Sequence, residues 1–105
     1  MSEHNSIYDL KGNLIGRFRH GVAWSSPVME RLGEYDDDFV FDNDRTMIAK
    51  VNDGHVLNII GEELGYISGN EIFVANSKVG SFIGLSSSGT AAVALIFNKR
   101  DTCGT

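Results

Sequence analysis

The sequence predicts an all-β fold of short antiparallel hairpins, repeated about every 16 residues and closed into a barrel-like or rosette-like assembly. First, the stretch from Val40 to Gly84 reads three times as the same unit, with copies that start at Val40, Val56 and Ile72. Second, each unit holds two apolar segments of strand length, bounded by polar or glycine turns. Third, twelve glycines against one proline indicate many turns.

Each central unit leads from an apolar start through a polar middle to a second apolar segment. That segment begins eight residues into the first two units, at Ile48 and Leu64, and seven residues into the third, at Val79, which indicates a shorter turn. An isolated hairpin is barely stable in water, so the apolar faces must pack on neighbours. Closure would leave the fewest unpaired edges, as a barrel, a sandwich or a propeller-like ring.

The clearest copy opens the fold. Residues 1–6 are expected to be a flexible end, and Ile7 then starts a hairpin that turns at Gly12-Asn13. A fainter copy follows at Val22. Its middle, Ser26–Arg31, also fits a single helical turn with a serine cap and Pro27 at the first helical position, and this reading is preferred.

After the repeats, Ser86 to Gly89 is expected to be a flexible break, either a loop or a mobile flap. The unbroken apolar run 91–97 is interpreted as a closing strand buried on both faces. A flexible tail, 98–105, ends the chain. The prediction is therefore a single domain, 1–105, with its repeats within 7–84.

Glycine recurs at the second position of the returning strand. It is found at Gly16, Gly65 and Gly80, with Ala49 as a near match. Such a recurrent gap marks a bend or a close strand contact. We expect these positions near the crowded centre of a closed structure, where a side chain has no room.

The phrase "aromatic, Asp, x, x, Gly, x, x, Ile, Gly" is complete in IYDLKGNLIGRF and degenerate in VFDNDRTMIAKV. It resembles the small bacterial repeat domains of the 4-fold beta flower family, in which short hairpins radiate about an axis. The resemblance covers at most residues 7–84, and the segment from Trp24 to Tyr35 departs from it. It implies a fold and no function.

Charge and composition exclude some functions. The formal charge of -5, with nine Lys and Arg spread along the chain, argues against nucleic-acid binding. No signal peptide and no apolar run of membrane-spanning length is found, so we expect no membrane partner and a cytoplasmic protein. The lone Cys103 agrees with a reducing compartment.

Catalytic and metal-binding patterns are weak. His20 and His55 fall in predicted turns, where they could meet an Asp from Asp36–Asp38, or Asp53, as metal ligands or acid-base groups. The spacings HxH, HExxH and CxxC are absent, and the pair Glu62-Glu63 fits a solvated turn. We therefore predict no catalytic residue, no metal and no cofactor, and the chain is not expected to be an enzyme.

Aromatic and histidine side chains are the best material for a binding surface. The candidate residues are Trp24, His20, Tyr35, His55 and Tyr66. Trp24 is the strongest, because its position is not dictated by the repeat.

The preferred function is a non-enzymatic β-repeat module that mediates protein–protein association or assembles with itself as a homo-oligomer. The alternative is a small-molecule binder or enzyme with an end cavity near Trp24, His20 and His55. A minor hypothesis has the acidic surface docking on a basic partner. The alternative requires His20 and His55 to lie on the same face.

Overall fold

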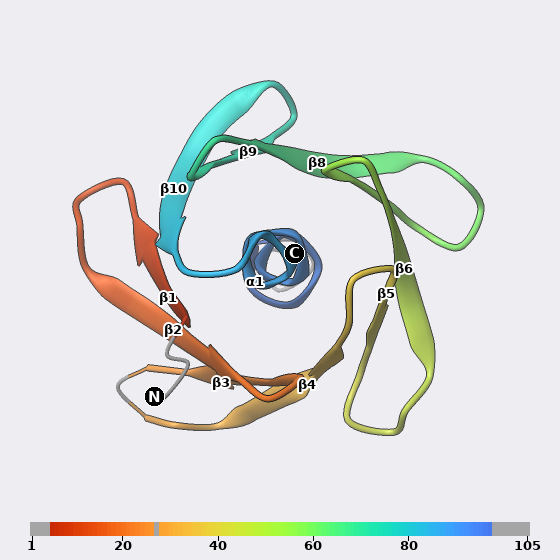
Figure 1. Ribbon diagram of the computed structural model, residues 1–105, viewed down its shortest axis with the longest axis horizontal. Helices are drawn as coiled ribbons and strands as arrows, with labels where there is room; N and C mark the ends of the chain where they lie inside the picture. Colours follow the sequence, from red (N-terminus) through yellow and green to blue (C-terminus); the bar gives the residue numbers. More distant parts are fainter. Residues whose placement is uncertain (1–4, 27, 98–105) are drawn as a thin grey trace, which may run out of the picture.

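The structure is a closed antiparallel barrel around a central helix (Figure 1). The computed structural model describes residues 5–26 and 28–97, so the predictions on Pro27, Cys103 and the tail 98–105 lie outside the described residues. The strands are β1 (Asn5–Asp9), β2 (Leu14–Arg19), β3 (Val22–Ser25), β4 (Arg31–Tyr35), β5 (Phe39–Phe41), β6 (Met47–Asn52), β7 (His55–Leu57), β8 (Glu63–Ser68), β9 (Glu71–Val74) and β10 (Ser77–Ile83). The predicted fold class, all-β and closed, is confirmed.

The strands form five hairpins, and the pairing of β1 with β10 closes the ring. Each hairpin contains one register shift of the β-bulge type at an equivalent place, which shows that the unit repeats in three dimensions. The first strands of the hairpins coincide with the predicted starts of the copies. Residues 5 and 6 belong to β1, so they are not part of a flexible end.

The helical turn predicted at Ser26–Arg31 is wrong, because this segment belongs to the regular hairpin β3–β4. Ser26 and Val28 lie in a turn, and Arg31 opens β4. The Ser25 hydroxyl accepts a hydrogen bond from the Glu30 N–H at 3.1 Å, and the Ser25 N–H donates to the Glu30 carbonyl at 2.8 Å. A serine that resembled a helix cap therefore closes a hairpin loop instead.

The closing strand predicted at 91–97 is also wrong, and so is the flexible break before it. The chain forms an α-helix, α1 (Ser86–Ala92), that continues into a π-helical turn, η1 (Val93–Phe97). Figure 1 shows this segment running along the barrel axis. All seven residues of the apolar run are buried, as expected for a helix that is surrounded on every side.

A ring of alternating aliphatic and small residues faces the helix. Within each hairpin, an inward aliphatic residue or alanine of the first strand pairs with glycine or alanine of the second: Ile7 with Gly16, Ala23 with Gly33, Val40 with Ala49, Val56 with Gly65 and Ile72 with Gly80. A Cβ added at Gly65 would overlap the Phe73 carbonyl oxygen and lie 2.9 Å from Val93 of η1. The predicted crowding at the recurrent glycines is confirmed.

A second inward layer lies two residues further along each returning strand. Three hairpins supply aromatic rings here, Phe18, Tyr35 and Phe82, and all three are buried. The other two supply the smaller Val51 and Ile67, which are only partly buried. This five-membered set is called the aromatic layer below.

The turns between hairpins and the start of α1 lie at one end of the barrel, since successive strands alternate in direction. This helix-entry end is formed by the turns at residues 20–21, 36–38, 53–54 and 69–70. The hairpin loops project outward around the periphery (Figure 1).

Candidate functional site

His55 and Tyr66, two of the predicted surface residues, lie side by side on the outer face of the barrel. They are paired across β7 and β8, and their ring centroids are 5.6 Å apart. Tyr66 stacks on Phe73 of β9 at 4.9 Å, and His55 Nδ1 lies 2.7 Å from Glu63 Oε1. These rings cover one another, so the row already contributes to the stability of the sheet.

Tyr35 lies inside the barrel and is therefore not part of a binding surface. It is 8% exposed, and its ring packs against Phe18 with centroids 5.3 Å apart. The strand alternation explains this position, because Tyr35 shares the inward face of β4 with Gly33.

Trp24 lies on a different outer face, between two arginines. It pairs with Arg17 of β2 on one side and with Arg31 of β4 on the other. One Arg31 Nη donates to Glu34 Oε2 at 2.6 Å and the other to Asn43 Oδ1 at 2.8 Å. Arg17, Arg19, Trp24 and Arg31 are called the Trp24 face below.

The arginines are unevenly distributed around the barrel. Within the described residues all four lie on β2, on β4 or in the neighbouring β5–β6 loop: Arg17, Arg19, Arg31 and Arg45. Arg31 and Arg45 both approach Glu34. Arg17 and Arg19 are exposed, and across the described chain no hydrogen bond or ion pair engages either guanidinium.

A cavity of about 300 Å³ opens at the helix-entry end. Its lining comes from the turns 36–38 and 53–54, the inner faces of β6 and β8, and the start of α1: Asp37, Val51, Asp53, Gly54, Ile67, Ser86, Ser87 and Thr90. Trp24, His20 and His55 do not line it. Two of the predicted acids, Asp37 and Asp53, do.

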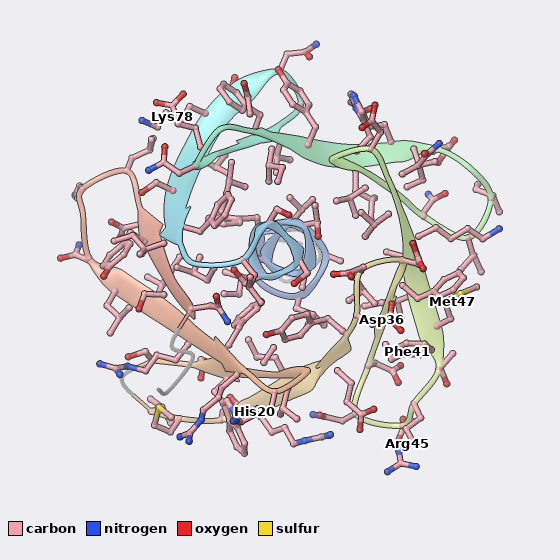
Figure 2. All side chains as sticks on the ribbon, viewed as in Figure 1. His20, Asp36, Phe41, Arg45, Met47 and Lys78 are labelled. Carbon is pink, nitrogen blue, oxygen red and sulfur yellow. The ribbon has the colours of Figure 1, made fainter. Side chains whose placement is uncertain are left out.

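His20, in the turn 20–21, and His55, the first residue of β7, lie at the same end but do not converge. His55 faces outward toward Glu63, and Figure 2 shows His20 on the outer side of the barrel wall. Two complete hairpins, β3–β4 and β5–β6, separate the turn that holds His20 from the turn that precedes His55. The metal or acid-base site that would have joined them does not form, and the described residues contain no group of three potential metal ligands.

The two carboxylates at the cavity are free of the turn contacts that engage other acids. Asp36 Oδ1, in contrast, accepts hydrogen bonds from the N–H groups of Asp38 and Phe39, each at 2.8 Å. Neither Asp37 nor Asp53 has a side-chain hydrogen bond or ion pair within residues 5–26 and 28–97. Their charges are available at the mouth of the cavity.

Comparison with protein-family models, curated proteins and solved structures gives no match. Membership of the 4-fold beta flower family therefore stays a prediction. In the described ranges, no helix has the length and apolarity that crossing a bilayer requires.

The sequence reasoning missed the arginines of the Trp24 face and the cavity wall. Strand alternation carried the first signal, since Arg17 lies between Gly16 and Phe18, both of which face inward. The cavity wall could not be found from strand alternation, because part of it is the central helix, which was not predicted from the sequence.

Proposed function

We propose that this protein is a non-enzymatic association module that binds an acidic segment of a partner protein through the Trp24 face. One observation carries the proposal: Trp24 stands in cross-strand register between Arg17 and Arg31. Tryptophan and arginine are the side chains that most often dominate protein–protein interfaces.

The charge pattern supports an acidic partner. The chain has a formal charge of -5, yet Arg17 and Arg19 are exposed and form no ion pair with any acid of residues 5–26 and 28–97. A planar guanidinium binds a carboxylate through two parallel hydrogen bonds, so complementarity favours Asp or Glu on the partner.

Residues paired across the neighbouring strands β1 and β10 extend the Trp24 face beyond Arg17, in a row that runs from Ile83 to Arg31. Arg17 pairs with Ser6 of β1, and Ser6 pairs with Ile83 of β10, a residue that is 60% exposed. An apolar position therefore lies at one end of the row and a tryptophan near the other, with a positive charge between them. A segment that combines acidic and apolar residues fits this sequence of contacts.

The test uses the fluorescence of Trp24, the single tryptophan of the chain. A short peptide of alternating glutamate and leucine is titrated into the protein, with a lysine–leucine peptide as the charge control. We expect a saturable change with the acidic peptide only. The apparent Kd should rise with salt, because exposed charges are screened.

The variant Arg17→Glu with Arg19→Glu should weaken binding at least about tenfold. Lys50→Glu, an exposed change of the same sign on β6, is the matched control and should leave Kd almost unchanged. Equal binding by both variants would refute the proposed face. Sedimentation of the protein alone separates self-assembly from binding of another chain: a dimer abolished by the double variant would make the partner a second copy.

A further inference from the structure

The cavity at the helix-entry end exists because the repeat is broken in two neighbouring hairpins. Three hairpins fill the aromatic layer with rings, and β6 and β8 fill it with Val51 and Ile67. Val51 and Ile67 lie two residues after the inward-facing Ala49 and Gly65 on their strands, so both side chains also face inward. Both residues nevertheless stay partly exposed. Val51 and Ile67 line the cavity, which occupies the volume that an aromatic ring at each of these positions would fill.

The helix side of the cavity is small and polar. Ser86, Ser87 and Thr90 lie on the first turns of α1, where bulky residues would have closed the gap. Thr90 is buried, and its hydroxyl lies 3.0 Å from the Ser87 carbonyl. The Thr90 hydroxyl thus has its partner inside the helix, and the charged groups that line the cavity are at its mouth.

Those groups are the carboxylates of Asp37 and Asp53, which come from successive turns between hairpins. In Figure 1 the connection from β4 to β5, which carries Asp37, bends inward toward the central helix. Each carboxylate is available to a ligand, because the described fold makes no use of either charge.

The amino end of α1 opposes a cation here but does not prevent its binding. A helix terminus is equivalent to about half a positive charge, and the two carboxylates bring two negative ones, so the mouth stays negative by about 1.5 charges. Electrostatics therefore selects a cationic ligand.

We propose that this cavity binds a short aliphatic diamine. Its ammonium groups would pair with Asp37 and Asp53, and its methylene chain would lie against Val51 and Ile67. A volume of about 300 Å³ is at the small end of known ligand sites, which suits a molecule of this size. The cavity is distinct from the Trp24 face, so either proposal can fail without the other.

The proposal is tested by NMR, with 1,4-diaminobutane as the probe and 1,4-butanediol as its uncharged counterpart. We expect saturable shifts of the backbone amides of Gly54, Ser87 and Thr90 with the diamine alone. The variant Asp37→Asn with Asp53→Asn should weaken binding at least about tenfold, the usual effect of losing charge-assisted hydrogen bonds. Asp44→Asn, on an exposed hairpin loop, is the control and should bind as the unmodified protein does.

A second variant tests the cavity itself. Val51→Phe gives β6 the aromatic residue that three other hairpins already hold at this position, so the barrel should fold and the diamine should no longer bind. Unchanged binding by Val51→Phe, or by the double asparagine variant, would overturn the proposal. It would also be overturned by equal shifts with butanediol, by tighter binding of Mg²⁺ at the same amides, or by shifts that never saturate.

Discussion

At the scale of single residues, the glycines of the inner ring determine how closely the hairpins approach the helix. Gly16, Gly33, Gly65 and Gly80 each face a different side chain of η1: Ile96, Leu95, Val93 and Phe97. At Gly33, Gly65 and Gly80 an added Cβ would also overlap a carbonyl oxygen of the next hairpin. Backbone cannot move aside as a side chain can, so the requirement for glycine is steric.

Gly65→Ala should therefore destabilise the barrel. We expect a loss of about 1–3 kcal/mol in the free energy of unfolding, which is typical of overpacking in a close-packed interior. Urea denaturation followed by circular dichroism measures it. Ala49→Gly, at the equivalent ring position, is the control and should cost only about 0.5–1 kcal/mol through the freedom it gives the unfolded chain. Equal stability of Gly65→Ala and the unmodified protein would contradict the steric account.

The position of these glycines was predictable from the sequence alone, because the period of about 16 residues revealed them without knowledge of the pairing. Gly33 was missed as a member of the set, since the unusual middle of its hairpin obscured the repeat. The outward arginines could be read from strand parity. The burial of Tyr35 could be read in the same way.

At the scale of elements, three hairpin loops use one device. The side-chain oxygen of Asp9 accepts hydrogen bonds from the N–H groups two and four residues on, those of Lys11 and Asn13, each at 2.9 Å. Asp42 and Asn58 make the same pair of contacts in their own loops. Since both Asp and Asn serve, the loop requires an oxygen acceptor on a short side chain, and a negative charge on that side chain is not essential.

The pKa of the Asp9 carboxyl is lowered from its ordinary value of 3.8, chiefly because the Asn13 N–H donates to the charged form. A carboxyl with a lower pKa in the folded protein stabilises it above the unfolded pKa, and that contribution is lost as pH falls through the folded value. We expect the melting temperature of the protein to decrease as the pH is lowered below about 4. Asp9→Asn, which introduces the residue type that Asn58 already provides in its own loop, keeps the acceptor and should show a smaller fall over the same range in calorimetry. An identical pH profile for the two proteins would exclude this role for Asp9.

The central helix shows where sequence reasoning failed. A run of seven apolar residues with β-branched and aromatic members fits a doubly buried strand and a surrounded helix equally well, because neither has a polar side. The preceding serines and Gly89 looked like a flexible break, yet Gly89 packs so closely on the Phe82 ring that it must lack a side chain. The choice between strand and helix depends on the diameter of the closed barrel, and the sequence of the apolar run gives no information about that diameter.

At the scale of the whole molecule, five hairpins and one helix are mutually dependent. Each hairpin presents one apolar face, and these faces join the buried residues of α1 and η1 in a single core. The cavity has the same origin, since two hairpins meet the helix with smaller side chains than the other three. Its existence was beyond the reach of the sequence, because the helix that forms its inner wall was expected to be a strand.

A chain that ends at Leu85 should therefore fail to form the barrel. We expect weak chemical-shift dispersion in its NMR spectrum, with dispersion restored when a separate peptide covering residues 84–98 is added. The same peptide with Leu95 and Ile96 replaced by serine is the control and should restore nothing. A well-dispersed spectrum for the shortened chain alone would show that the hairpins close without the helix.

The helix is the last described element of the chain, although it is the first that the barrel needs. During translation, all five hairpins leave the ribosome before the segment on which they converge has been made. The nascent protein consequently passes through a stage in which the apolar inner faces of its hairpins have no central helix to pack against. It is at this stage, rather than in the finished fold, that the protein is most exposed to aggregation and most in need of a chaperone.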